Sequence, residues 1–178
     1  MTYITKNASG TYYYLDPEKT IAHREDGPAV EAFNGDEEYW VNGKLHRVDG
    51  PAVAYANGDE EWWLNGERHR DDGPACSFFD VPFSYVEGKF VLDYDSSNAT
   101  MEEYVYTWFI NNQVHREGGP AVIISNGYEA WYICDQPHRM DGPAIHNVYT
   151  PNEWYYNGIK IYCKNKDEFD LAVSKIVN

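Results

Sequence analysis

Residues 46–68 read HRVDGPAVAYANGDEEWWLNGER, and the fold follows from the way this stretch recurs along the chain. The word His-Arg-x-Asp-Gly-Pro-Ala, or a close variant of it, stands at five places. Successive copies begin 23 residues apart, except that 46 residues separate the third copy from the fourth. A fixed period of this size is typical of stacked repeats, whereas catalytic groups are assembled once. The five copies begin at His23, His46, His69, His115 and His138.

Most copies also carry Asn-Gly pairs, which favour the positive φ angles of tight hairpin turns. The quoted unit holds two of them, Asn57-Gly58 and Asn65-Gly66. PAVAYA and DEEWWL then become antiparallel strands, and LHRVDGP carries the chain over to the next hairpin. The sequence therefore predicts an all-β array of about six antiparallel hairpins in one long meander. Further Asn-Gly pairs stand at 34–35, 42–43, 126–127 and 157–158.

The 46-residue gap is twice the period, so a further copy is expected to begin at residue 92, where LDYDSSNA replaces the word. Because the register is kept, we expect the structural unit to survive as a degenerate copy near residues 81–106. Its Ser96-Ser97-Asn98 loop departs from the regular turns, and irregular loops on a scaffold often carry recognition.

The last segment, NKDEFDLAVSKIV, has the periodicity of a helix rather than of a strand. Asn165 followed by Glu168 is the pattern of a capping box at its start. The apolar face of this helix comprises Phe169, Ala172, Val173 and Ile176.

An open array needs its terminal apolar faces covered, so this helix is expected to cap the last repeat. We expect one repeat domain over residues 1–178. It would hold an N-terminal cap strand in 1–22, hairpin repeats in 23–163 and a C-terminal capping helix in 164–178.

Side-chain alternation divides the strand before each second turn into two faces. One face is apolar in every copy and is expected to form the core. The other face carries one aromatic residue per copy between mostly polar neighbours. Stacked hairpins would space these aromatics about 9.5 Å apart. The expected core face holds Tyr39 and Val41, Trp62 and Leu64, Trp108 and Ile110, Trp131 and Ile133, and Trp154 and Tyr156. The expected aromatic stripe comprises Trp40, Trp63, Phe109, Tyr132 and Tyr155.

Composition narrows the classes of partner. The net charge of −15 and pI near 4.6 argue against direct binding to nucleic acid, which needs a basic surface. No stretch approaches the roughly 20 apolar residues of a membrane helix, and the first residues lack a signal-peptide run. The cysteines, Cys76, Cys134 and Cys163, have neither zinc nor redox spacing. We therefore expect reduced, half-buried thiols in a cytoplasmic protein, or in the host cytoplasm if the protein is viral.

Residues 37–59, EEYWVNGKLHRVDGPAVAYANGD, resemble MORN repeats, which are arrays of hairpins of about this length. The W-x-N-G-K-x-H core of those repeats is matched in order by Trp40, Asn42, Gly43, Lys44 and His46. After the histidine, MORN repeats place Gly-x-Gly, whereas this chain has Arg-x-Asp-Gly-Pro-Ala. The variant is similar to uncharacterised arrays of bacteria, phages and large DNA viruses. The resemblance covers roughly residues 20–160 and implies a hairpin sheet used as a binding scaffold, without a fixed catalytic residue.

The repeated His, Arg and Asp could serve a metal, acid–base chemistry or the fold itself. Each copy offers two ligands of suitable type, too few for a transition metal, and no nucleophile motif accompanies them. We interpret them as structural: Asp49 accepting from Arg47 and from loop amides, and His46 tying down a carbonyl. No catalytic residue, metal or cofactor is expected. The structural set comprises His23, Arg24, Asp26, His46, Arg47, Asp49, His69, Arg70, Asp72, His115, Arg116, His138, Arg139 and Asp141.

Because the repeated residues are assigned to the fold, function is expected on the surface of the array. One candidate is the aromatic stripe, and another is an acidic run beside it that could meet a basic protein. The favoured hypothesis is a non-catalytic acidic protein-binding module. Its specific form would be a phage-encoded inhibitor or adaptor of a host protein. The alternative is a small-molecule or carbohydrate binder that uses the stripe. The acidic run comprises Asp36, Glu37, Glu38, Asp59, Glu60 and Glu61.

Overall fold

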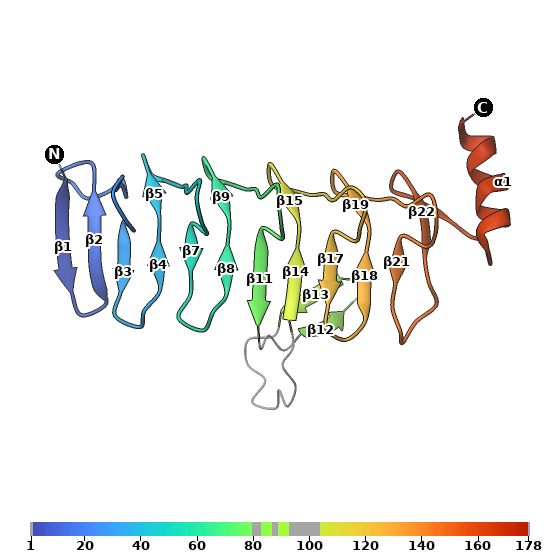
Figure 1. Cartoon of the computed structure of the whole chain (residues 1–178), viewed down its shortest axis with the longest axis horizontal. Helices are drawn as coiled ribbons and strands as arrows, with labels where there is room; N and C mark the ends of the chain where they lie inside the picture. Colours follow the sequence, from blue (N-terminus) through green and yellow to red (C-terminus); the bar gives the residue numbers. More distant parts are fainter. Residues whose placement is uncertain (1, 80–82, 87–88, 93–103, 178) are drawn as a thin grey trace.

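The fold was analysed on a computed structural model, which describes residues 2–79, 83–86, 89–92 and 104–177. Its main body is one antiparallel sheet of 11 strands that follow one another in chain order (Figure 1). The predicted all-β meander of hairpins is confirmed. The strands are β1 (Tyr3–Asn7), β2 (Gly10–Tyr14), β3 (Val30–Ala32), β4 (Glu37–Glu38), β7 (Val53–Ala54), β8 (Glu60–Glu61), β11 (Cys76–Phe79), β14 (Tyr104–Thr107), β17 (Val122–Ile124), β18 (Tyr128–Ala130) and β21 (Ile145–His146).

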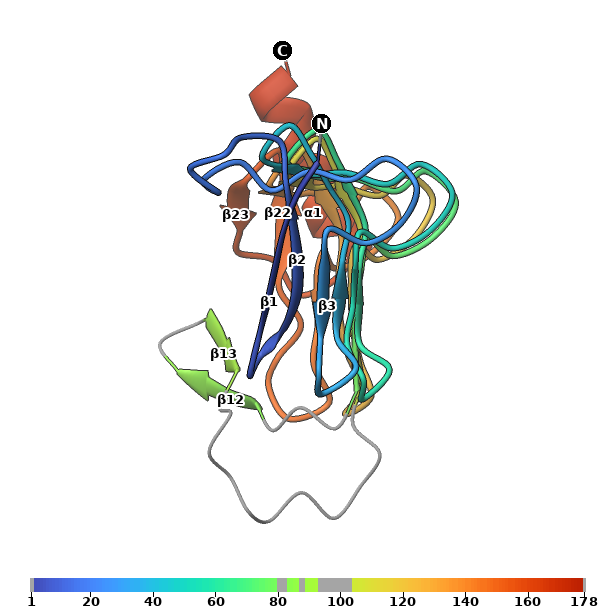
Figure 2. The same ribbon diagram turned by 90° about the vertical axis from the view of Figure 1, so that its left-hand side faces the viewer.

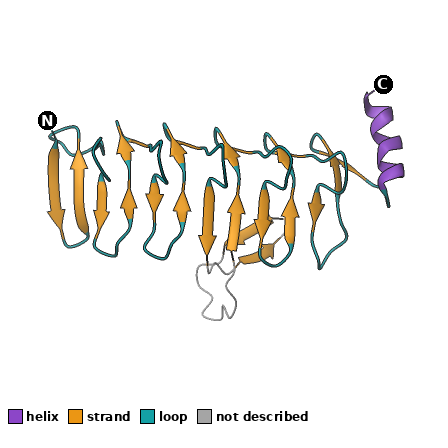
Figure 3. Ribbon diagram, viewed as in Figure 1, coloured by secondary structure: helices purple, strands orange, loops and turns teal. Residues whose placement is uncertain are grey.

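Each repeat adds a second, shorter hairpin above the main sheet, as Figure 3 shows. The two Asn-Gly pairs of a unit build different turns. Asn65 and Gly66 both have positive φ, 54° and 86°, as a two-residue hairpin turn requires. At Asn57-Gly58 only the glycine has positive φ, and the Asn57 side chain accepts from the Asp59 amide. The short hairpins are β5 (Trp40–Val41) with β6 (Lys44–Leu45), β9 (Trp63–Leu64) with β10 (Glu67–Arg68), β15 (Phe109–Ile110) with β16 (Gln113–Val114), β19 (Tyr132–Ile133) with β20 (Gln136–Pro137), and β22 (Trp154–Tyr156) with β23 (Ile159–Ile161).

The 46-residue gap holds an insertion, so the predicted degenerate copy near 81–106 is wrong. Cys76 pairs with Thr107, 31 residues later, whereas the equivalent Val53 pairs with Glu61, 8 residues later. The excess equals one period, which is why the register is kept although the described residues of this segment, 83–86 and 89–92, add no strand to the main sheet. Strands β12 (Phe83–Val86) and β13 (Lys89–Leu92) pair with each other in a separate hairpin. The Ser96-Ser97-Asn98 loop lies outside the described residues.

The two ends of the array differ. The segment 1–22 forms a hairpin, β1 with β2, rather than a single cap strand. Its turn is fixed by Asn7, whose side chain accepts from the Ser9 amide, and by Gly10, which lies so close to Glu31 that a Cβ would be 2.3 Å from the carbonyl oxygen. At the other end helix α1 (Lys166–Val177) stands against the last unit (Figure 1).

Helix α1 is fixed to the array by an apolar cluster. Phe169 is fully buried, packs with Ile161 and Val173, and its ring centroid lies 5.2 Å from that of Trp154. Ile176, predicted on the same face, is 45% exposed because the last helical turn extends beyond the cluster. Asn165 accepts from the Glu168 amide, as predicted for the cap, and Glu168 in turn accepts from the Lys164 amide.

The predicted core face meets a buried cluster in the last unit, where Trp154 and Tyr156 pack against Phe169 and its neighbours. In the other described copies the core lies elsewhere. Those aromatic and aliphatic side chains are half-buried, because the main sheet is a single layer in this part of the chain. The fully buried residue of each copy is instead the alanine after the proline. Ala52, for example, donates to the Glu61 carbonyl and accepts from the Tyr39 amide, so it sits between two neighbouring strands. The buried alanines are Ala29, Ala52, Ala75, Ala121 and Ala144.

Candidate binding surfaces

The sheet has two faces with different chemistry. The five crossover segments that carry the repeated word gather on one side, at the right in Figure 2. We call this side the crossover face. Alternation along the strands places Trp40, Trp63 and Phe109 on the other side, which we call the stripe face.

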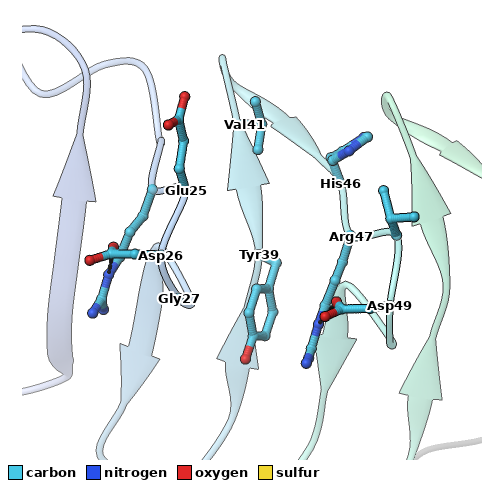
Figure 4. Close-up of a pocket in the computed structure, with 10 residues that line it drawn as sticks. Glu25, Asp26, Gly27, Tyr39, Val41, His46, Arg47 and Asp49 are labelled. Atoms are coloured by element: carbon cyan, nitrogen blue, oxygen red, sulfur yellow. Dashed lines mark hydrogen bonds and ion pairs between the residues drawn. The ribbon is translucent and has the colours of Figure 1, made fainter.

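On the crossover face each arginine of the word closes its own loop. The guanidinium carbon of Arg47 lies 4.0 Å from the centre of the Tyr39 ring. Its Nε donates to Asp49 at 3.1 Å and its Nη1 donates to the Pro51 carbonyl at 3.3 Å (Figure 4). A Cβ at Gly50 would stand 2.8 Å from the guanidinium carbon, so a larger residue there would displace the guanidinium group. The same stacking, at 3.8–4.1 Å, joins Arg24 to Tyr13, Arg70 to Trp62, Arg116 to Trp108 and Arg139 to Trp131.

The histidines join one unit to the next. His46 Nδ1 accepts from the amide of Asn65, 19 residues later in the following tight turn, at 3.1 Å. The expectation that His46 ties down a carbonyl is therefore wrong, because the backbone group it meets is an N–H. The same contact joins His23 to Asn42, His115 to Cys134 and His138 to Asn157, while His69 contacts the Asn111 side chain. These contacts agree with a structural role for the word.

Replacing Asp141 by alanine tests that role. Arg139 Nε donates to Asp141 at 2.7 Å, and this hydrogen bond lowers the pKa of the carboxyl group below its ordinary 3.8. A lowered pKa stabilises the fold above 3.8, and that contribution is lost as pH falls through the lowered value. We expect Asp141→Ala to lower the melting temperature slightly at neutral pH, because Asp141 is 82% exposed, and by less near pH 2. Calorimetry at both pH values, with Met140→Ala as control, checks this. An equal drop at both would contradict the assignment.

Grooves lie between successive crossover loops. The groove of about 690 Å³ between the first two is lined by Tyr39, His46 and the two Arg–Asp pairs of Arg24 and Arg47 (Figure 4). The carboxylates on its rim are highly exposed, 86% for both Asp26 and Asp49. The sequence predicted a structural role alone for these aspartates. Because each of them is paired with an arginine, they add little net charge to this face.

The stripe face brings the predicted aromatics together. Trp40, Trp63, Phe109, Tyr132 and Tyr155 all lie half-buried on it. In three copies a glutamate two residues earlier accepts from the aromatic side chain. These bonds run from Trp40 to Glu38 at 2.7 Å, from Trp63 to Glu61 at 3.0 Å and from Tyr155 to Glu153 at 2.8 Å.

The predicted acidic run does not form one patch. Alternation sends Glu37 and Glu60 to the crossover face, and Glu38 and Glu61 to the stripe face. Glu61 is 8% exposed and is bound by Trp63 and by Arg68. The two aspartates are turn residues that link hairpins. Asp36 accepts from the Ala56 amide at 2.9 Å, and Asp59 accepts from the Phe79 amide at 2.6 Å.

An apolar depression of about 370 Å³ opens in the middle of the stripe, between Phe109 and Tyr132. Val105, Val122 and Val114 contribute to its walls. Cys76 lies at its base, and burial raises the pKa of the thiol to about 12, so the base of the depression is uncharged.

The depression was not predicted, although the sequence carries its signal. Eight residues before the start of the following period, other copies place Glu38, Glu61 and Glu153, whereas the two central copies place Thr107 and Ala130. Because two adjacent copies lack the carboxylate, the row of side chains at this position is charged in the outer copies and uncharged in the two central copies.

Ion pairs flank the depression on both sides. Towards the N-terminus Arg68 contacts Glu61 at 3.1 Å and lies 4.5 Å from the Trp63 ring centre. Towards the C-terminus Lys160 contacts Glu153 at 2.9 Å. Arg68 and Lys160 occupy equivalent positions, one residue before the start of the following period. The stripe face therefore has an apolar centre with charged borders.

Other site types find no support in the described part of the chain. It holds no group of three or more His, Cys, Asp or Glu side chains placed to bind a metal ion. Among the described helices none is long and apolar enough to cross a membrane. The cysteines are free thiols; Cys76 is buried and Cys134 exposed, so the expectation that all are half-buried holds for Cys163 alone.

Comparisons with protein-family models, curated proteins and solved structures give no match to this chain. The class that the geometry defines is an open array of antiparallel hairpins that form one main sheet.

Proposed function

We propose that this protein is a non-catalytic protein-binding module that receives its partner on the stripe face. The observation that carries the proposal is the apolar depression between Phe109 and Tyr132, bordered by ion pairs. Protein interfaces combine an apolar, desolvated centre with a polar rim, and aromatic side chains contribute most of their binding energy.

The partner is expected to present an apolar side chain surrounded by basic residues. The net charge of −15 attracts a basic protein and speeds its encounter. The array has no cofactor in this proposal. Its specific form is an inhibitor or adaptor of phage origin that acts on a host protein in the cytoplasm, in keeping with the resemblance to MORN-like arrays.

A small-molecule binder is the second candidate. A volume of about 370 Å³ lies within the range of small-ligand sites, and the flat rings of Phe109 and Tyr132 suit stacking against a ring. The walls favour an apolar ligand over a carbohydrate, because a sugar needs several polar partners within the site.

Thr107→Glu tests whether the partner binds on the stripe face or on another surface. Other copies hold a glutamate at this position, so the repeat accepts it, while the new carboxylate enters the depression. The matched control is Ile123→Glu on the opposite face, where the first copy holds Glu31. We expect Thr107→Glu to weaken partner binding at least about tenfold, since it places an unpaired charge in the interface, and Ile123→Glu to leave binding unchanged.

The measurement is affinity capture from lysate of the relevant cell at low and high salt, with bound proteins and small molecules identified by mass spectrometry. A stoichiometric protein retained by wild type and Ile123→Glu, and lost with Thr107→Glu, supports the proposal. Retention of that protein by folded Thr107→Glu would refute it. Recovery of a small molecule alone would favour the second candidate.

A further inference from the structure

The fourth crossover departs from the other four at one position. Gly118 stands where the remaining copies place Asp26, Asp49, Asp72 and Asp141. In those copies the aspartate accepts from the arginine Nε at 2.9, 3.1, 2.8 and 2.7 Å. Within the described residues, Arg116 has no ion pair with any carboxylate.

The guanidinium of Arg116 keeps its place without that partner. It lies 3.9 Å from the centre of the Trp108 ring, and Nη1 donates to the Pro120 carbonyl at 3.0 Å. A Cβ at Gly119 would be 3.0 Å from its central carbon, the value also found at Gly27 in the first copy. The ring, the carbonyl and the glycine therefore fix the cation, and its Nε–H is oriented before anything binds to it.

Space is present where the carboxylate is missing. A Cβ added at Gly118 would meet no atom within 4 Å, but the φ of Gly118 is +76°, so the loop backbone differs here from the other copies and a side chain at this position would be strained. The adjoining groove, about 320 Å³, is lined by Trp108, His115 and Arg116, and also by three carboxylates, Asp71 and Asp72 of the third crossover and Glu117. It corresponds to the groove of Figure 4, in which Asp49 holds the equivalent arginine.

We propose that this groove binds a carboxylate group supplied from outside the chain, with Arg116 Nε as its donor. The other four copies provide the template, because each shows a carboxylate oxygen on the same donor of an equally stacked arginine. Neighbouring acids do not prevent it, since Glu25 stands beside Asp26 and Asp71 beside Asp72 in copies that hold the carboxylate. A preoriented donor also lowers the entropic cost of binding. The site lies on the face opposite the stripe and is independent of the proposed function.

The test follows the arginine Nε–H resonances of the full chain by ¹H–¹⁵N spectroscopy during titration with sodium acetate, against sodium chloride at equal ionic strength. We expect a saturable shift of the Arg116 signal, assigned by its loss in Arg116→Lys. The equivalent signals of Arg24, Arg47, Arg70 and Arg139 should stay in place, which makes them controls within the same molecule. An Arg116 shift no larger than theirs, or equal shifts with chloride, would overturn the proposal.

Gly118→Asp provides the matched variant, because it supplies the missing carboxylate from within the loop. Its Arg116 signal should begin at the shifted position and should not respond to acetate; a full acetate response in the folded variant would contradict the assignment. If this variant does not fold, the wild-type comparison of the five arginines decides alone. A blocked Gly-Asp-Gly peptide then distinguishes the source of the carboxylate. Saturation at lower concentration than acetate indicates a protein side chain, and saturation by acetate alone indicates a small carboxylate.

Discussion

Phe169→Ala is expected to lower the free energy of unfolding by about 3–5 kcal/mol, the range for removing a large buried aromatic side chain. Phe169 is fully buried and joins helix α1 to Trp154 and Ile161. Each repeat is stabilised by its nearest neighbours, so the loss of stability should be largest in the last unit. Hydrogen exchange should show faster exchange for β22 and β23 than for β7 and β8, and denaturant unfolding gives the total.

Leu171→Ala is the control for this substitution, because Leu171 belongs to the same helix but is 60% exposed. It should change stability by less than about 0.5 kcal/mol. If Phe169→Ala proved equally mild, α1 would not be the cap of the array, and the end of the sheet would have to be stable without it.

Ala52→Leu is expected to destabilise the protein by about 1–3 kcal/mol, because a larger side chain has no room between closely spaced strands. Ala52 is fully buried, and its backbone is bonded on both sides, to Glu61 and to Tyr39. At about 2–4 °C per kcal/mol for a chain of this length, the melting temperature should fall by several degrees.

Ala56→Leu makes the same change four residues later, at an exposed turn position of the same hairpin, and should be nearly neutral. Thermal melts of both variants, compared with wild type, check the pair. Similar melting temperatures for the two would mean that the buried alanine column is not what sets the spacing of the units.

The fold was largely predictable because its signals are local and repeated. Asn-Gly pairs fix turns by their φ preferences, and a period of 23 residues places one unit on the next. The insertion after β11 was not predictable by counting, since its length equals the period. Only the pairing of Cys76 with Thr107 reveals it.

The surfaces were predictable in part. Alternation predicts that Trp40 and Trp63 share one face, because successive side chains of a strand point to opposite sides. It could not show that the opposite face is covered by stacked guanidinium groups rather than by a second layer. That depends on where a crossover loop folds back, as with Arg47 over Tyr39. The depression beside Phe109 needs two neighbouring copies together, so reading single units misses it.

The hairpin of β11 and β14 keeps its regular pairing although it carries an extra segment at its tip. The long turns of the other hairpins lie at the same end of the strands, the lower end in Figure 1. Each is therefore a point at which the array can acquire a new segment without losing a unit. Diversity can accumulate there while both faces keep their chemistry. In practice, a tag or a small folded domain introduced between Asn57 and Gly58 should leave the rest of the array assembled.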